Sequence, residues 1–126
     1  MVKKIINTPD APPPIGPYNQ AIMAGDTLYI AGQICLDAKT GELKNTDVRE
    51  ETRQAMLNLQ YVLQAAGMSF ANVVKTTIFI TDMKQFQEIN EEYGKFFESD
   101  FPARETVQVA ALPKFVNVEI SMIAVK

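Results

Sequence analysis

The sequence predicts an α+β protein, a mixed sheet of about six strands with two helices on one face. Short segments rich in β-branched residues alternate with two segments whose apolar residues recur at helical spacing. The resulting order is β-β-β-α-β-α-β-β. Right-handed crossovers place both helices on the same side of a sheet, so the other face stays uncovered.

The opening third of the chain is predicted to be β-structure. Residues Lys3–Ile6 suit a short edge strand, and Asn19–Ala24 and Thr27–Gln33 flank a Gly25-Asp26 turn with the spacing of a hairpin. Between them, five of the seven prolines lie from Pro9 to Pro17, which predicts a loop with a defined path.

A helix is predicted to begin near Val48 and to stop at Gly67. Asp47 and Glu50 have the spacing of a capping box. The apolar positions recur on one side of the helix and form its core stripe: Val48, Thr52, Ala55, Met56, Leu59, Val62, Leu63 and Ala66.

The second half is predicted to contain a strand over Asn72–Ile80 and a helix capped by Asp82. The core stripe of that helix comprises Phe86, Ile89, Tyr93 and Phe96 or Phe97. Two further strands, Arg104–Ala110 and Asn117–Val125, surround a turn at residues 112–114. In the Asn72 strand, alternation puts Val74 with Thr76, Ile78 and Ile80, opposite to Val73, Lys75, Thr77 and Phe79.

Composition restricts the function classes. The chain has 126 residues, 47% of them hydrophobic and 21% charged, so we expect one domain over residues 1–126. Histidine is absent, which removes the commonest general base and imidazole metal ligands. A net charge of −3 argues against nucleic acid as a partner. No glycine pattern matches a phosphate-binding motif, and we expect neither metal nor cofactor.

The location expected from the sequence is the cytoplasm. No signal-like segment develops, and no run approaches the ~18 apolar residues of a membrane span. Cys35 is the only cysteine, so no intramolecular disulfide forms, and with no histidine to activate it we expect an inert thiol.

The uncovered face of the sheet would carry Tyr29, Phe79, Ile123 and Val125. Such a patch is large for a monomer, so we expect it to pack against further copies of the chain. Glu119, on the same side, must then be paired or must serve a site.

Two charged residues are candidates for chemistry. Arg104 follows Phe101-Pro102-Ala103 at the start of a strand, where its guanidinium can grip a carboxylate or form an interface salt bridge. An antiparallel arrangement of the two last strands would bring Glu119 near it. Glu119 is then either a proton carrier that orients water or a counter-charge for Arg104 or Lys75.

Three further positions have a functional and a structural interpretation. Tyr18 leaves the rigid proline loop and either contacts a ligand or covers the edge of the core. Gly32 either lets the backbone approach a ligand or marks a bulge. Asn90 either reaches a site or is a solvated polar residue.

The motifs resemble the Rid proteins, the reactive-intermediate or imine deaminases also called the YjgF group, and specifically the RidA branch. The similarity spans the chain, in the segments Ile15–Ala21, Ala31–Ile34, Val74–Phe79, Phe101–Arg104, Val109–Lys114, Val118–Ile120 and Ile123–Val125. It implies a chorismate-mutase-like fold and a homotrimer with three clefts between subunits.

The resemblance also implies roles for individual residues. It assigns Arg104 to the substrate carboxylate, Tyr18 and Asn90 to the cleft wall, Gly32 to a backbone contact and Glu119 to the hydrolytic water. Many RidA proteins carry cysteine where this chain has Thr106, which leaves a role for the Thr106 carbonyl in holding that water.

The hypothesis that follows is hydrolysis of small 2-imino acids to 2-oxo acids and ammonia, without a covalent enzyme intermediate. Enamines such as 2-aminoacrylate tautomerise to imines that water attacks readily, so orientation and one proton carrier suffice. The alternative is a trimeric sensor that binds 2-oxo acids and regulates a partner enzyme. A ribonuclease ranks last because of the acidic balance and the absence of histidine.

Overall fold

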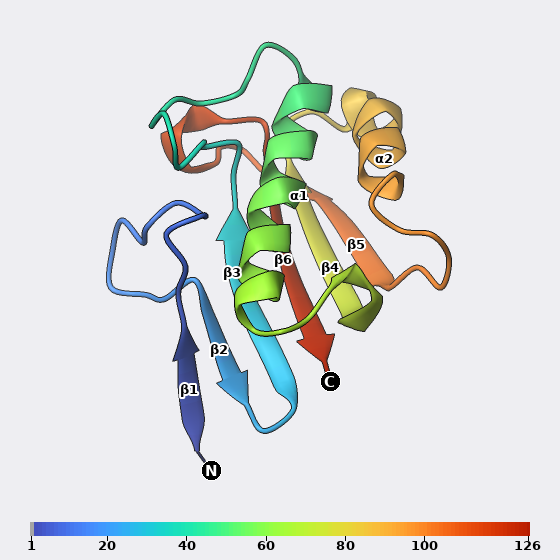
Figure 1. Cartoon of the computed structure of the whole chain (residues 1–126). Helices are drawn as coiled ribbons and strands as arrows, with labels where there is room; N and C mark the ends of the chain where they lie inside the picture. The colour runs from blue at the N-terminus through green and yellow to red at the C-terminus, as the bar shows by residue number, and fades with distance from the viewer. Residues whose placement is uncertain (1) are drawn as a thin grey trace.

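The computed structural model describes residues 2–126, which form one six-stranded mixed sheet with two α-helices on one face (Figure 1). Along the sheet the strands lie in the order β1-β2-β3-β6-β4-β5. Only β4 and β5 pair in parallel. The predicted fold class is confirmed. The elements are β1 (Lys3–Ile6), β2 (Ala21–Ala24), β3 (Thr27–Gln33), α1 (Val48–Ala65), β4 (Val73–Ile80), α2 (Phe86–Gly94), β5 (Ala103–Gln108) and β6 (Val118–Val125).

The proline loop is fixed by a buried side chain, Gln20. Its amide nitrogen donates to the carbonyl oxygens of Thr8, Ala11 and Pro12, and its amide oxygen accepts from the Thr8 N–H at 2.7 Å. The side chain that precedes β2 therefore holds the loop that leads to Tyr18. The predicted hairpin follows, with Gly25 in the left-handed region at φ 59°.

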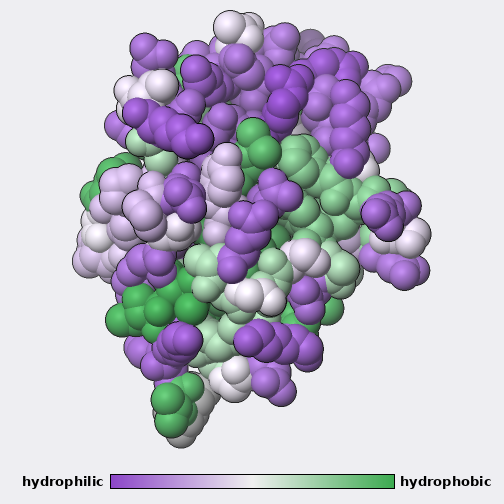
Figure 2. Space-filling view, viewed as in Figure 1, coloured by the Kyte–Doolittle hydropathy of each residue, from purple (hydrophilic) through white to green (hydrophobic). Residues whose placement is uncertain are grey.

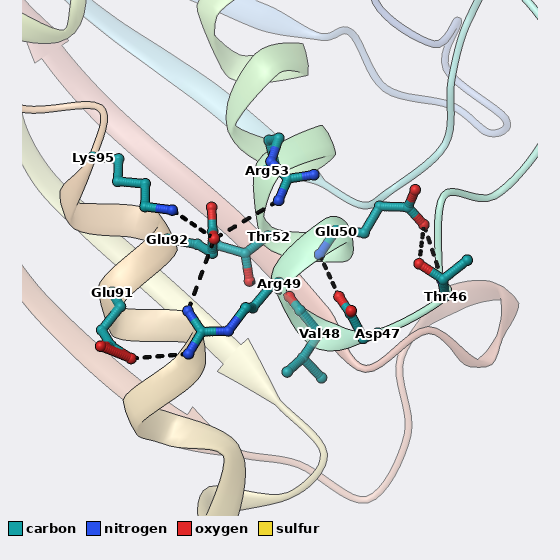
Figure 3. Close-up of polar contacts among 10 residues, drawn as sticks. All are labelled: Thr46, Asp47, Val48, Arg49, Glu50, Thr52, Arg53, Glu91, Glu92 and Lys95. Carbon is teal, nitrogen blue, oxygen red and sulfur yellow. Dashed lines mark hydrogen bonds and ion pairs between the residues drawn. The ribbon is translucent and has the colours of Figure 1, made fainter.

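Helix α1 begins at Val48, as predicted, because the Asp47 carboxylate accepts from the Glu50 N–H. The capping box does not close in the expected way: the Glu50 carboxylate accepts from the N–H and hydroxyl of Thr46, one residue before the cap (Figure 3). Burial of the predicted core stripe is confirmed, and α1 packs over β3 and β6.

Helix α2 is held against α1 by a buried carboxylate, Glu92. Figure 3 shows Arg49 and Arg53 of α1 and Lys95 directed toward it. The shortest of these ion pairs, from Lys95 Nζ to Glu92 Oε1, measures 2.9 Å. The carboxylate is buried while its cations lie at the surface, so the pairing joins the two helices beside the solvent.

The second half departs from the predictions in three local ways. Helix α2 ends at Gly94, so Phe96 and Phe97, predicted on its core stripe, follow the helix and pack against the core from there. Asp82 caps a short 3₁₀ turn at Met83–Gln85, which leads into α2, so the α-helix itself starts later. A bulge between Val73 and Lys75 shifts the register of β4, so Val73 points into the core and Val74 to solvent, opposite to the simple alternation.

Hydrophilic side chains gather at the end of the molecule where α1 begins, and apolar side chains show lower on the same face (Figure 2). On the opposite face of the sheet, which no helix covers, Tyr29 is 50% exposed and Val125 37%. Lys75 on that face pairs with Glu105 at 3.1 Å. Within residues 2–126, neither helix combines the length and the apolar character that crossing a bilayer requires.

Candidate functional site

Arg104 projects from β5 toward α2. The register places it beside Thr76, whose side chain is fully buried on the helix side of the sheet. Its Nη1 donates to Asn90 Oδ1 at 2.6 Å, and its guanidinium lies 5.1 Å from the ring centre of Tyr93 and 5.5 Å from that of Phe86. Among the described residues, no carboxylate lies within ion-pair distance of Arg104.

The guanidinium therefore has its orientation fixed by neutral groups while its charge stays available. Asn90 uses one N–H of the five that the guanidinium offers. Beside it lies an open cleft of about 400 Å³, lined by Asn90, Tyr93, Gly94, Phe101, Pro102 and Arg104. A small carboxylic acid fits both this volume and this charge.

Tyr93 was predicted as a core residue, and it is one, yet it also supports Arg104. Its hydroxyl donates to Thr76 Oγ1 at 3.0 Å, and burial raises the pKa of Tyr93, so the ring stays neutral. The sequence gives no local signal for this second role, because Tyr93 lies on α2 and Arg104 on β5, 11 residues further along the chain.

Glu119 lies on the open face of β6, above Gly32 of β3. A Cβ atom added to Gly32 would lie 2.6 Å from Glu119 Oε2 and 2.8 Å from its Cδ. The carboxylate thus occupies the space that any side chain at position 32 would fill. The sheet register shifts between Ile30 and Gln33, which favours the bulge interpretation of Gly32. The other interpretation, a backbone approach to a ligand, stays a prediction.

The Glu119 carboxylate has no ion-pair partner among residues 2–126, so the predicted counter-charge role toward Lys75 or Arg104 within one chain is wrong. Burial raises its pKa above the ordinary glutamate value. A half-buried carboxyl of this kind can exchange protons closer to neutral pH than an exposed one.

Tyr18 stands at the end of the proline loop with its ring half exposed. Its hydroxyl oxygen accepts from the Ile15 N–H at 3.4 Å, which orients the phenol. Tyr18 and Gly32 line one small cavity of about 40 Å³, to which Lys114 also contributes. Lys114 was not selected from the sequence. Its backbone lies in the left-handed region, at φ 55°, and this conformation cannot be seen in the sequence.

The expected closeness of Arg104 and Glu119 is wrong within a single chain. Strand β4 separates β5 from β6, and β5 runs parallel to β4. Arg104 shares the face of Thr76, whereas Glu119 pairs with Phe79 and shares the opposite face. The candidates thus divide into an arginine half-site (Asn90, Arg104 and Thr106) and a glutamate half-site (Tyr18, Gly32 and Glu119).

Cys35 lies outside both half-sites and is fully buried. Its thiol donates to Glu51 Oε1 at 3.8 Å, and burial, together with the Glu51 charge, raises the pKa of Cys35 to about 12. This agrees with the expectation of an inert thiol. No cluster of His, Cys, Asp and Glu suited to a metal ion occurs in the portion of the chain described.

Comparison with known proteins gives the class. The family model "Endoribonuclease L-PSP" matches residues 8–126. The chain belongs to this family, known also as the Rid or YjgF family, and the resemblance to it that the motifs predicted is confirmed.

Relatives and solved structures agree over nearly the whole length. The human and bovine proteins named 2-iminobutanoate/2-iminopropanoate deaminase are 45% and 48% identical, matching 100% of this chain and 92% of theirs. A RutC family protein of Pyrococcus horikoshii is 48% identical over 99% of both chains. The structure of E. coli TdcF with bound serine is 43% identical, has a TM-score of 0.94 and is matched over 98% of both chains.

Proposed function

We propose that this protein hydrolyses small 2-imino acids, such as 2-iminopropanoate and 2-iminobutanoate, to 2-oxo acids and ammonia. The observation that carries the proposal is the Arg104 guanidinium, oriented by Asn90 and two aromatic rings, free of any acidic partner in the described chain, and facing a cleft of about 400 Å³. The relatives named as imine deaminases support the same reaction.

Arg104 binds the substrate carboxylate. A planar guanidinium presents two parallel N–H groups to the two oxygens of a carboxylate, which fixes the direction of the acid as well as its position. Asn90 and Tyr93 hold the guanidinium in one rotamer, so that little conformational entropy is lost on binding.

Glu119 orients the attacking water and carries protons. Water adds to the imine carbon, the resulting tetrahedral carbon loses its nitrogen as ammonia, and the carbon–oxygen double bond of the 2-oxo acid forms. Each step moves protons between oxygen and nitrogen, and a carboxyl whose pKa burial raises is suited to accept and return them. The Thr106 carbonyl helps to hold the water.

The complete site lies between copies of the chain. Arg104 and Glu119 occupy opposite faces of one sheet, so a single chain cannot direct both at one substrate. The uncovered sheet face, with Tyr29 half exposed, supplies an apolar surface for association. A homotrimer in which the arginine half-site of one copy meets the glutamate half-site of the next forms three such clefts.

The test is release of ammonia and 2-oxo acid from 2-aminoacrylate generated by a coupled dehydratase. Replacing Arg104 by alanine should cost roughly 2–5 kcal/mol of transition-state stabilisation, read as the fall in kcat/KM. Arg104→Lys should recover only part of the rate, because an ammonium group cannot bind a carboxylate through two parallel hydrogen bonds.

Arg49 provides the matched control. It is also a partly exposed arginine, but it serves the ion pairs between α1 and α2. Arg49→Ala should keep the wild-type rate. Full deaminase activity in Arg104→Ala would contradict the proposal.

A further inference from the structure

A fully buried carboxylate lies on the core side of α1. Glu51 has no exposed surface, and no cation of residues 2–126 lies within ion-pair distance of it. Burying a carboxylate is costly unless hydrogen-bond donors replace the water that it loses. The groups that donate to Glu51 are therefore held firmly in place.

Two of the three donors to Glu51 belong to one residue, Asn117. Glu51 Oε1 accepts from the Asn117 N–H and Oε2 accepts from the Asn117 side-chain amide, each at 2.8 Å. The third donor is the Cys35 thiol, at 3.8 Å. One carboxylate thus binds the backbone and the side chain of Asn117 together, which fixes both the position and the orientation of that residue.

Asn117 is also bound by Thr81, the residue that follows β4. The Thr81 hydroxyl donates to Asn117 Oδ1 at 2.8 Å, and the Thr81 N–H donates to the Asn117 carbonyl oxygen at 3.1 Å. Asn117 immediately precedes β6, which pairs with β4 from Val118 onward. Glu51 therefore holds, through Asn117, the point at which β6 enters the sheet.

Glu119 lies two residues beyond this point, about 6.6 Å along the strand. Its carboxylate has no ion-pair partner in the described chain and occupies the space above Gly32. The backbone of β6 therefore decides where the carboxylate lies. A misplacement of about 1 Å at a reacting site can lower a rate on the order of a hundredfold.

We propose that Glu51 is a positioning residue that sets, through Asn117, the place of the Glu119 carboxylate in the reaction. This inference rests on the proposed function and deepens it. Glu51 does not contact the substrate, because it is buried beneath α1 on the helix side of the sheet, whereas Glu119 lies on the opposite face.

The experiment exchanges the carboxylate and the amide of the Glu51–Asn117 pair. In Asn117→Asp two carboxylates face each other, so the start of β6 should shift and kcat for 2-aminoacrylate should fall about tenfold. In the double variant, Glu51→Gln with Asn117→Asp, the introduced amide donates to the introduced carboxylate. The N–H at position 117 and the Thr81 hydroxyl keep their acceptors there. The double variant should recover kcat to within about twofold of wild type.

Two readouts separate positioning from a loss of stability. KM should stay within about twofold of wild type in each variant, because in the proposed reaction Arg104 binds the substrate carboxylate and β6 does not. In a Glu119→Gln background, Asn117→Asp should cause no further fall in kcat, because the group that it misplaces is already absent.

Asp47→Ala is the matched control. It removes a hydrogen bond from the first turn of the same helix, so it should lower the melting temperature while kcat stays at the wild-type value. Asn117→Ala is a second test variant that adds no charge. Asn117 is exposed, so this variant should fold, and kcat should fall by a smaller factor than in Asn117→Asp, again with KM unchanged.

Three results would overturn the role of Glu51 while wild type still releases ammonia and 2-oxo acid. They are an unchanged kcat in both Asn117 variants, a double variant that recovers nothing, and an equal fall in kcat with and without Glu119→Gln. A wild type that lacks the activity would instead overturn the proposed function, and the role of Glu51 with it.

Discussion

At the scale of single residues, the contact between Gly32 and Glu119 couples a backbone position to the carboxylate that we propose as the proton carrier. The carboxylate lies where a Cβ would be, yet it is the mobile end of a side chain and can move away. A small side chain at position 32 should therefore displace the carboxylate and leave the fold in place.

Gly32→Ala is accordingly expected to lower deaminase kcat by about tenfold or more, the scale of a misplaced proton carrier, with little change in melting temperature. The measurement is steady-state kinetics beside thermal unfolding. Gly41→Ala is the control, because its position is open to solvent, although its φ of 74° costs some stability. A large fall in melting temperature with unchanged kcat in Gly32→Ala would show that the glycine serves the backbone only.

The raised pKa of Glu119 predicts a pH dependence of stability. Because burial disfavours the ionised form, the contribution of Glu119 to the free energy of unfolding is fully present below its unfolded pKa of about 4.3 and is lost as pH rises through the raised folded pKa. Glutamine does not titrate. The difference in free energy of unfolding, wild type minus Glu119→Gln, should therefore decrease from about pH 3.5 to pH 7. Urea unfolding at both pH values measures it, and an increasing difference would contradict the burial effect.

Some of the important single residues could be selected from the sequence, and others could not. Arg104, Glu119, Tyr18 and Gly32 could be selected because their residue type and setting are unusual. Glu51 and Asn58 could not be selected in this way. Both are polar residues of α1, outside its predicted apolar stripe, and both are fully buried. Glu51 accepts from the backbone and side chain of Asn117, 66 residues away, a partner that no local pattern reveals.

At the scale of elements, the sequence predicted correctly those features that depend only on neighbouring residues. The start of α1 follows from the hydrogen bond that the Asp47 carboxylate accepts from the Glu50 N–H, three residues further along the chain. The bulge in β4 and the parallel pairing of β4 with β5 depend on strands distant in sequence, so alternation alone placed Val73 and Val74 on the wrong faces.

Asp47→Ala should reduce the free energy of unfolding by about 1 kcal/mol, the usual value of an N-cap hydrogen bond. Denaturant unfolding at a fixed protein concentration measures it, because the proposed association would also contribute to stability. Asp26→Ala, in the exposed turn between β2 and β3, should have little effect. Equal losses in both variants would argue against a special role for the cap.

At the scale of the whole molecule, the open sheet face could be predicted from the sequence. The prediction requires only that there are two helices and that both lie on the same side of the sheet. How the two half-sites would meet in the proposed homotrimer was not predictable, since it depends on the placement of another chain. The division found within one chain makes that placement testable.

Mixing Arg104→Ala with Glu119→Gln should restore activity. If the proposed trimers form at random from equal amounts, about a quarter of the clefts combine an intact arginine with an intact glutamate. Unfolding and refolding the mixture, followed by the deaminase assay, measures the recovery. A chain that carries both substitutions, mixed with either single variant, should recover nothing. Absence of recovery in the first mixture would contradict a site shared between copies.

Placing Arg104 and Glu119 on opposite faces of the sheet also has a genetic consequence. Each copy would border two clefts, giving its cation to one and its acid to the other. A cell that makes two versions of the chain would build hybrids, and a version lacking both groups would disable two clefts of every trimer it joins. Such an allele would be dominant-negative toward the wild-type allele.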